Sequence, residues 1–163
     1  MPNIDHIQIN LSEQKLYLLD ANQQTIHEYP ISSSAYGSGN QSGSFQTPLG
    51  EHVISEKIGE QASEMEVFIG RQPQGVLSDL MDKAVELPED IITSRIMWLE
   101  GCEPGLNQGG DVDTHQRYIY IHGTNEENTI GSPVSHGCIR MKNTDVIELF
   151  GLVDTGCPVI IEK

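Results

Sequence analysis

The sequence has few basic residues, and this shortage excludes two classes of partner. Its 163 residues contain 9 Lys and Arg against 24 Asp and Glu, which gives a formal net charge of −15. A nucleic-acid-binding protein needs a basic face that displaces counterions. Binding to an anionic lipid surface also needs positively charged residues. We therefore expect neither nucleic acid nor membrane as a partner.

Long hydrophobic runs and paired cysteines are also missing. No stretch approaches the roughly 18–20 apolar residues of a membrane span. Residues 1–7 lack the basic start and the apolar run of a secretory signal. The three cysteines, Cys102, Cys138 and Cys157, are widely spaced and form no CxxC pair. This pattern is typical of a reducing compartment with at least one free thiol, so a cytoplasmic location is expected.

The length and the composition are those of an ordinary globular domain. About 70% of the unfolded surface of a chain this long is buried on folding, so a core forms without disulfides or metal. With 37% hydrophobic residues and no internal repeat or linker, the sequence predicts a single domain over residues 1–163.

The hydrophobic pattern predicts a mainly β fold. Alternation of polar and apolar residues indicates strands at residues 7–11, 16–19 and 25–29, and β-branched and aromatic residues alternate over a further strand at 117–122. Strands are also expected at residues 51–57, 96–99 and 159–161, the last of them buried. A glycine- and serine-rich loop separates the third and fourth strands. One helix is expected to be capped by Ser78 and to stop at Pro88, and another to be capped by Asn143 or Thr144. The architecture expected is a β-sandwich or partly open barrel with two or three short helices.

The chemistry indicated by the sequence centres on His122 and Cys138. A cysteine nucleophile needs its proton removed near neutral pH, and an imidazole at the end of a neighbouring strand can take it. Gly137 permits close approach of a substrate to the backbone, where the Cys138 amide can stabilise an oxyanion. His136 either orients this loop or supports the oxyanion site, and Ser135 is expected to make a turn bond.

These segments resemble a known family. His122-Gly123, followed by a loop and Ser135-His136-Gly137-Cys138-Ile139-Arg140-Met141, is similar to the signature of the L,D-transpeptidase (YkuD) catalytic domain. The segment Thr47-Pro48-Leu49-Gly50 resembles another element of that family. The resemblance extends over nearly the whole chain, except for residues 61–114, which we interpret as a candidate lid insert.

The resemblance implies acyl transfer on a peptidoglycan stem peptide. Cys138 would attack the carbonyl between meso-diaminopimelate and the terminal D-Ala of a tetrapeptide. His122 would act as base, oriented by the Gly123 carbonyl. Water as acceptor gives an L,D-carboxypeptidase acting in muropeptide recycling, whereas the amine of a second stem gives a 3→3 cross-link. Without a visible signal we favour the carboxypeptidase, whose partner is a muropeptide. No cofactor is implied, and carbapenems are expected inhibitors.

Several roles stay open at this stage. Arg140 either binds a substrate carboxylate or forms a salt bridge that locks the loop. Tyr120 either faces the cleft and contacts substrate or packs within the sheet, while Cys102 and Cys157 are interpreted as structural. Two rival functions are a zinc hydrolase and a non-catalytic muropeptide-binding module. The zinc ligands would come from His115, His122, His136 and Cys138, although their spacing fits no recurrent ligand pattern.

Overall fold

The computed structural model describes residues 3–163, which form one ten-stranded mixed sheet with two α-helices. The strands are β1 (His6–Asn10), β2 (Lys15–Leu19), β3 (Thr25–Pro30), β4 (Gly50–Ile58), β5 (Glu66–Ile69), β6 (Gln72–Val76), β7 (Ile92–Gly101), β8 (Tyr120–Thr124), β9 (Ile139–Met141) and β10 (Pro158–Glu162). The helices are α1 (Leu77–Asp82) and α2 (Asn143–Leu152), with short 3-10 turns η1 (Gly110–Val112) and η2 (Glu127–Thr129). No helix in the described part of the chain is long and apolar enough to cross a membrane.

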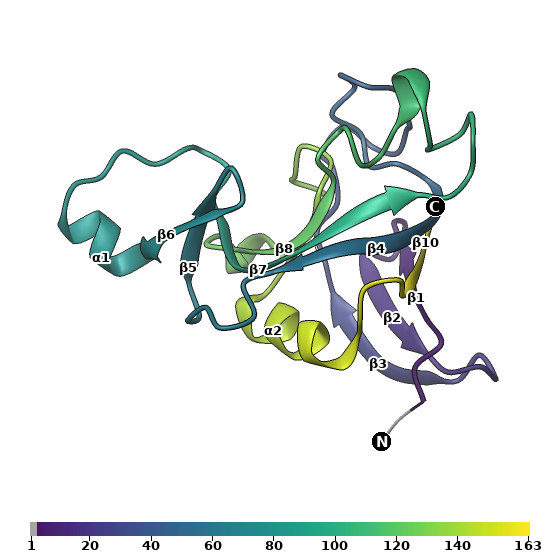
Figure 1. Ribbon diagram of the computed structural model, residues 1–163, viewed down its shortest axis with the longest axis horizontal. Helices are drawn as coiled ribbons and strands as arrows, with labels where there is room; N and C mark the ends of the chain where they lie inside the picture. Colours follow the sequence, from purple (N-terminus) through teal and green to yellow (C-terminus); the bar gives the residue numbers. More distant parts are fainter. Residues whose placement is uncertain (1–2) are drawn as a thin grey trace.

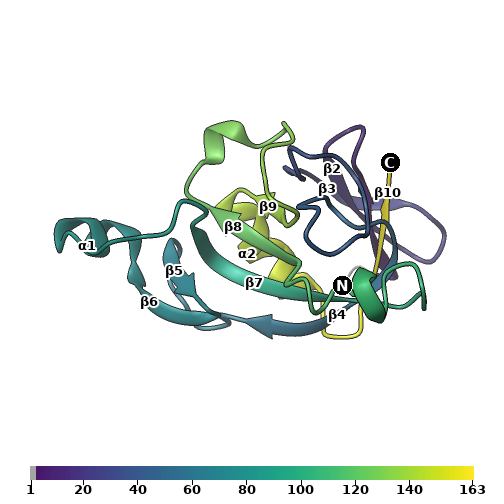
Figure 2. The ribbon, with the colours of Figure 1, turned by 90° about the horizontal axis from the view of Figure 1, so that it is seen from above.

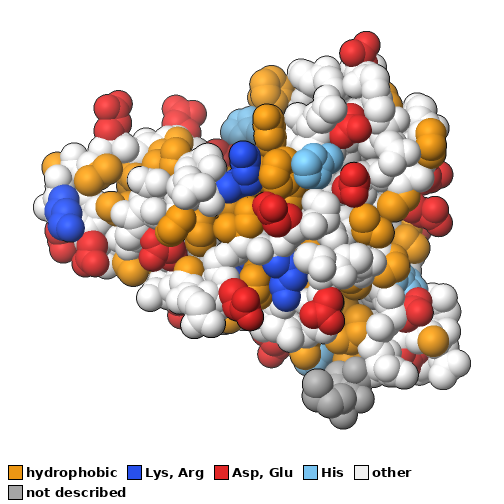
Figure 3. Space-filling view, in the orientation of Figure 1, with side chains coloured by type: hydrophobic (Ala, Val, Ile, Leu, Met, Phe, Trp, Pro, Cys, Tyr) orange, Lys and Arg blue, Asp and Glu red, His pale blue; other side chains and the backbone are white. Residues whose placement is uncertain are grey.

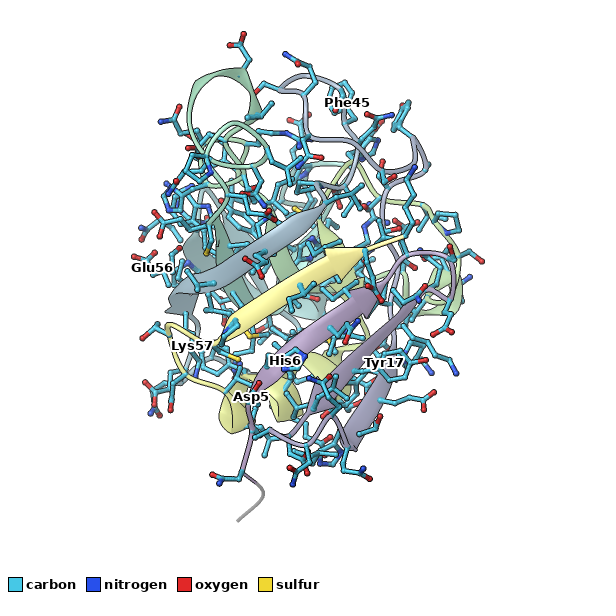
Figure 4. The ribbon with its side chains drawn as sticks, turned by 90° about the vertical axis from the view of Figure 1, so that its right-hand side faces the viewer. Asp5, His6, Tyr17, Phe45, Glu56 and Lys57 are labelled. Atoms are coloured by element: carbon cyan, nitrogen blue, oxygen red, sulfur yellow. The ribbon has the colours of Figure 1, made fainter. Side chains whose placement is uncertain are left out.

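The sheet is open and strongly twisted. Its order is β3-β2-β1-β10-β4-β7-β5-β6, and β8 pairs with β7 on one side and with β9 on the other. The pairs β1–β10 and β8–β9 are parallel, and the remaining pairs are antiparallel. Figure 4 shows β10 lying between β4 and β1. The prediction of a mainly β fold with short helices is confirmed, and the sheet remains open rather than closing into a barrel.

The first three strands form the predicted meander. The register pairs Ile7 with Leu18 and Ile9 with Leu16, so the alternating apolar residues all enter the core. The loop over residues 31–49 follows β3 without a regular strand, as its glycine and serine content predicts. Its first residues pair with β9 and with the segment before it, through bridges between Ser32 and Arg140 and between Ser34 and Ser135.

The core lies between the sheet and α2. Figure 2 shows α2 beneath β7 and β8, on the face of the sheet opposite the 31–49 loop. Val146, Leu149 and Phe150 of α2 pack against Ile121 of β8 and Met97 of β7. These apolar contacts bury β8, which carries His122, and its neighbour β7, so the site rests on packed elements.

The strand expected at residues 117–122 is displaced along the chain. β8 runs from Tyr120 to Thr124, and residues 117 and 118 form a turn in which Tyr118 has a φ of +57°. The β-branched and aromatic alternation predicted a strand, but the left-handed turn interrupts it. Tyr118 is consequently exposed, while Tyr120 is buried.

The middle of the chain forms an arm that extends from the body (Figure 1). β5 and β6 pair as a hairpin where the sequence pattern predicted no strand, and the helix that follows is shorter than predicted. Helix α1 covers only Leu77–Asp82; Val76 occupies the cap position that was assigned to Ser78, and Met81 is exposed. The insert proposed at 61–114 also contains β7, a central strand of the sheet, so only residues before Ile92 project as an arm.

The N-cap of the second helix lies one residue before Asn143, the earlier of its two expected caps. Lys142 occupies the N-cap position and makes no side-chain cap bond, whereas Asn143 is the first helical residue. The Asn143 side chain is buried and bonds to other elements. Tertiary contacts thus take precedence over the local capping preference of asparagine.

Candidate functional site

The parallel pair β8–β9 brings the two principal motif residues to one face of the sheet. The register places His122 opposite Arg140 and Ile121 opposite Ile139. Cys138 directly precedes β9, two residues before Arg140, and side chains two residues apart share a face. The sheet therefore places Cys138 and His122, which are 16 positions apart in the sequence, on the same side of adjacent strands.

The Cys138 sulfur contacts the backbone at the start of β8 and in the turn before that strand. The Tyr120 N–H donates to Sγ at 3.3 Å, and the thiol donates to the Tyr118 carbonyl at 3.4 Å. Cys138 is partly exposed as a residue, but it packs against the apolar cluster that contains Tyr120. Burial raises the pKa of the thiol to about 12, although the Tyr120 N–H favours the thiolate. At pH 7 the group is therefore a neutral thiol.

His122 is fully buried and held in one orientation. Its Nδ1 lies 2.5 Å from the Gly123 carbonyl oxygen. Nδ1 therefore carries the hydrogen and donates a hydrogen bond to that carbonyl. Nε2 has no hydrogen-bond partner among the described residues and is free to accept a proton. Burial lowers the pKa of His122, a trend that nearby Asp90 opposes. The imidazole is therefore neutral at pH 7, as a general base requires.

Gly123 is packed so closely that only glycine fits. A Cβ at this position would lie 2.5 Å from Oδ1 of Asn143 and 2.6 Å from the Thr93 carbonyl oxygen. Asn143 itself accepts hydrogen bonds from Thr93 Oγ1 at 2.5 Å and Ser94 Oγ at 2.6 Å, and donates to the Thr124 carbonyl at 2.8 Å. No sequence signal pointed to this buried amide, which connects β7, β8 and α2 behind His122.

The loop before Cys138 is fixed from both sides. Gly137 has a φ of +129°, and its N–H donates to Ser135 Oγ, which in turn donates to the Cys138 carbonyl. Ser135 thus makes the expected turn bonds. On the other side, Thr47 donates from Oγ1 to the Gly137 carbonyl at 3.0 Å. This contact explains how the Thr47-Pro48-Leu49-Gly50 element reaches the site.

Arg140 forms the salt bridge that the sequence analysis had left as one of two alternatives. Its Nη2 lies 2.8 Å from Oδ1 of Asp90 and its Nη1 lies 3.5 Å from Oε1 of Glu126. The guanidinium side chain is only 4% exposed. Asp90 also lies 3.7 Å from Nδ1 of His136. Arg140 therefore holds the loop against the base of the arm, and no sequence signal pointed to Asp90 as its partner.

His136 and two aromatic residues form an exposed rim near the thiol. Tyr36 and Phe45 lie with their ring centroids 5.8 Å apart, and each is 6.1 Å from the His136 ring. Figure 4 shows Phe45 on the loop above the sheet, away from the strands. His136 is more than half exposed, so its side chain faces outward and is accessible to a ligand.

Arg117 anchors the loop that borders this rim. Its Nη2 donates to the Gln46 carbonyl at 2.6 Å and its Nη1 to the Gly39 carbonyl at 3.3 Å. A pocket of about 220 Å³ lies here, next to the Cys138 loop; its lining includes Arg117, Ile119 and His136. Burial lowers the pKa of Arg117, which still carries its positive charge near the sulfur.

Tyr120 lies within the sheet with its hydroxyl directed toward the arm. It is 6% exposed, and the hydroxyl accepts a hydrogen bond from Arg71 at 3.1 Å. The proposed zinc ligands are not brought together: His115 stacks on Trp98 with ring centroids 4.0 Å apart. Within residues 3–163, no group of three or more His, Cys, Asp or Glu side chains is placed to hold a metal ion. The three cysteines are free thiols.

Comparison with known proteins places this arrangement in a family. The model of the YkuD L,D-transpeptidase catalytic domain matches residues 4–161. The chain belongs to the L,D-transpeptidase catalytic-domain family. The resemblance noted in the sequence is thereby confirmed, and it extends through the arm as well as the motif strands.

Relatives of this L,D-transpeptidase domain occur in Bacillus subtilis. The chain is 31% identical to YqjB, a protein named as an L,D-transpeptidase, over 134 residues, which cover 70% of this chain and 76% of YqjB. It is 56% identical to YkuD of the same organism over 62 residues, which cover 35% of this chain and 38% of YkuD.

Solved L,D-transpeptidases share the fold. A structure from Xylanimonas cellulosilytica matches with a TM-score of 0.58 at 14% identity, covering 99% of this chain and 62% of that one. LdtMt1, solved in complex with imipenem, matches with a TM-score of 0.56 at 16% identity, covering 98% of this chain and 59% of that one. The chain spans about three-fifths of the length of these two structures.

Proposed function

We propose that this L,D-transpeptidase-family domain transfers the acyl group of a peptidoglycan stem peptide through a thioester at Cys138. One observation carries the proposal. The unpartnered Nε2 of buried His122 lies on the same face of β8 and β9 as the Cys138 thiol, and Nδ1 is held by Gly123. A nucleophile, a base and a group that orients the base are the three parts that thiol acyl transfer requires.

The neutral state of both groups defines the sequence of proton transfers. Nε2 of His122 takes the thiol proton as Sγ attacks the carbonyl between meso-diaminopimelate and D-Ala. The imidazolium then protonates the leaving amine as the C–N bond breaks, which releases D-Ala and leaves a thioester. Because burial disfavours both charged forms, the proton moves during the attack rather than before it.

We further propose that water is the main acceptor, which makes the protein an L,D-carboxypeptidase. Water loses a proton to Nε2 as it attacks the thioester, and the thiol is restored. A pocket of about 220 Å³, whose lining includes Arg117, Ile119 and His136, lies next to the Cys138 loop and can take one residue of the stem that is cleaved. Cross-linking, in which the amine of a second stem replaces water, is the alternative outcome of the same thioester.

Product analysis tests both parts of the proposal. The protein is incubated with the tetrapeptide stem, and free D-Ala, tripeptide and cross-linked dimer are measured by mass spectrometry. We expect D-Ala and tripeptide without dimer. Cys138→Ala and His122→Gln should abolish release, whereas Cys102→Ser, which changes an exposed thiol outside the site, should retain it. Abundant dimer would favour cross-linking, and full turnover by Cys138→Ala would refute the nucleophile.

β-Lactam acylation gives a second test that needs no peptide substrate. LdtMt1 was solved in complex with imipenem, a carbapenem. We expect imipenem to add its mass to this protein once, with the adduct on the Cys138 peptide. The mass shift should be absent from Cys138→Ala and present in Cys102→Ser; an adduct that persists in Cys138→Ala would contradict the assignment.

A further inference from the structure

The β5–β6 hairpin carries an arginine to the motif strands. The hairpin turns through Gly70 and Arg71, with φ values of +56° and +65°. Positive φ is unfavourable for a residue with a side chain, so Arg71 occupies a position that glycine or asparagine would fill more easily. The turn directs the guanidinium back toward the body rather than into solvent along the arm.

Aromatic side chains near the thiol hold the Arg71 guanidinium. Its carbon lies 4.6 Å from the centroid of the Trp98 ring and 5.5 Å from that of Tyr118. Nη1 donates to the Tyr120 hydroxyl at 3.1 Å. Figure 3 shows that basic side chains are few on one face of the molecule, where acidic side chains are scattered. Stacking on rings immobilises a guanidinium but leaves the N–H groups at its edge available.

Tyr120 connects this guanidinium directly to the nucleophile. The backbone N–H of Tyr120 donates to Cys138 Sγ, and its hydroxyl accepts from Arg71. The two groups are thus separated by one tyrosine side chain, a length comparable with one or two residues of extended peptide, at roughly 3.3–3.6 Å per residue. A carboxylate one residue beyond an attacked carbonyl falls within this range.

The charge of Arg71 has no carboxylate partner. Among residues 3–163, every Asp or Glu oxygen is beyond ion-pair distance of Arg71, and Glu56 acts only at longer range. The other two arginines near the site are engaged: Arg140 by Asp90 and Glu126, and Arg117 by loop carbonyls. In a chain with a net charge of −15, a partly exposed cation without an acidic partner is available to an anionic ligand.

We propose that Arg71 binds the free terminal carboxylate of the peptide that is cleaved at Cys138. Its planar guanidinium, held by Trp98 and Tyr120, offers two parallel N–H groups to a carboxylate. The site therefore selects peptides in which the residue that leaves carries an unblocked C-terminus. The substrate part of this inference rests on the proposed function, whereas the recognition of a carboxylate beside the thiol does not.

The first experiment compares a free and a blocked C-terminus. Wild type, Arg71→Gln and Arg71→Lys are assayed on the tetrapeptide acid and on its C-terminal amide, with Lys83→Gln as an exposed control on the same arm. We expect Arg71→Gln to raise KM for the acid at least about tenfold, the typical effect of losing a charge-assisted pair. The amide should be unaffected, Arg71→Lys should recover part of the loss, and Lys83→Gln should match wild type. Equal effects on acid and amide, or none on either, would overturn the proposal.

A second experiment separates this inference from the proposed function. Alkylation of Cys138 by iodoacetate and by neutral iodoacetamide is followed by the mass of the Cys138 peptide, with no peptide substrate present. Arg71→Gln should slow iodoacetate several-fold relative to iodoacetamide. If Arg71→Gln lowers the ratio of the iodoacetate rate to the iodoacetamide rate but the wild type does not cleave the tetrapeptide, the proposed function is refuted and the carboxylate site is supported. Cleavage with an unshifted ratio and unchanged acid preference would refute the role of Arg71 alone.

Discussion

Asp90 and Arg140 lie 50 residues apart in the sequence and form an ion pair, with 2.8 Å between Oδ1 of Asp90 and Nη2 of Arg140. Arg140 follows the candidate nucleophile, Cys138, by two residues. Asp90 ends the segment that returns from the arm to β7, and Arg140 lies in the middle of β9. This contact attaches the base of the arm to the loop that carries Cys138. The same carboxylate is close to His136 and raises the pKa of His122 against the effect of burial.

Asp90→Asn should weaken both the fold and the site. The substitution leaves the buried Arg140 guanidinium with Glu126 alone, at the longer distance of 3.5 Å. Because Asp90 is one-third exposed, we expect a loss of roughly 1–3 kcal/mol in the free energy of unfolding, less than for a fully buried pair. Urea denaturation measures the loss. Glu89→Gln, an exposed neighbour, should stay within about 0.5 kcal/mol of wild type, and equal effects of both changes would contradict the role of the pair.

Two glycine-to-alanine substitutions should have opposite signs. Gly123→Ala places a methyl group against Asn143 and the Thr93 carbonyl, and should cost about 2–3 kcal/mol of stability and most of the activity. Gly151→Ala, in helix α2, meets open space and should stabilise the protein by roughly 0.5–1 kcal/mol, because alanine restricts the unfolded chain more than glycine does. Thermal melts and tetrapeptide turnover distinguish them. A stable, active Gly123→Ala protein would contradict the close packing behind His122.

The activity should persist in mildly acidic solution. The proposed mechanism needs a neutral His122, and the lowered pKa of this histidine keeps the imidazole neutral somewhat below pH 6.5. We therefore expect kcat/KM to fall only as the pH drops below 6.5, through that lowered pKa. Asp90→Asn removes a negative charge that raises the pKa of His122. In this variant the acid limb, the fall of kcat/KM at low pH, should therefore move to still lower pH. In Glu89→Gln it should stay where it is in the wild type. An acid limb above pH 6.5 in wild type would contradict the burial of the base.

A second buried histidine should make stability depend on pH. His52 in β4 bonds through Nε2 to Thr114 and through Nδ1 to the Gly50 carbonyl, and burial lowers its pKa to about 4. Below pH 6.5 the unfolded chain binds a proton at this site that the folded chain does not. Stability is therefore lost as the pH falls from 6.5 toward 4, by up to roughly 3 kcal/mol.

Urea denaturation between pH 4 and pH 8 measures the dependence on His52. His52→Gln removes the titrating group and should flatten this part of the stability curve, even though it lowers stability at pH 7. Parallel curves for wild type and His52→Gln would show that the histidine is not held neutral in the folded protein.

Much of the sheet could be predicted from short-range pattern. Ile7, Ile9, Leu16 and Leu18 alternate along their strands, and each lies in the core as expected. The pattern was misleading where a single residue breaks it: Tyr118 belongs to an alternating run but adopts a left-handed conformation, which moves β8 to Tyr120. The short hairpin β5–β6 was missed because Pro73 and Gly75 are poor indicators of a strand.

Short-range sequence pattern was enough to indicate the family, the mainly β fold and the candidate site residues Cys138, His122 and Gly123, because those residue types form a recognisable motif. Which charges are already paired depends on contacts that form in the folded protein. The tertiary structure places Asp90 against Arg140, Asn143 behind Gly123 and Arg71 over the rings beside the thiol. These contacts join segments far apart in the chain, and their energy comes from burial and charge pairing that exist only once the sheet has assembled.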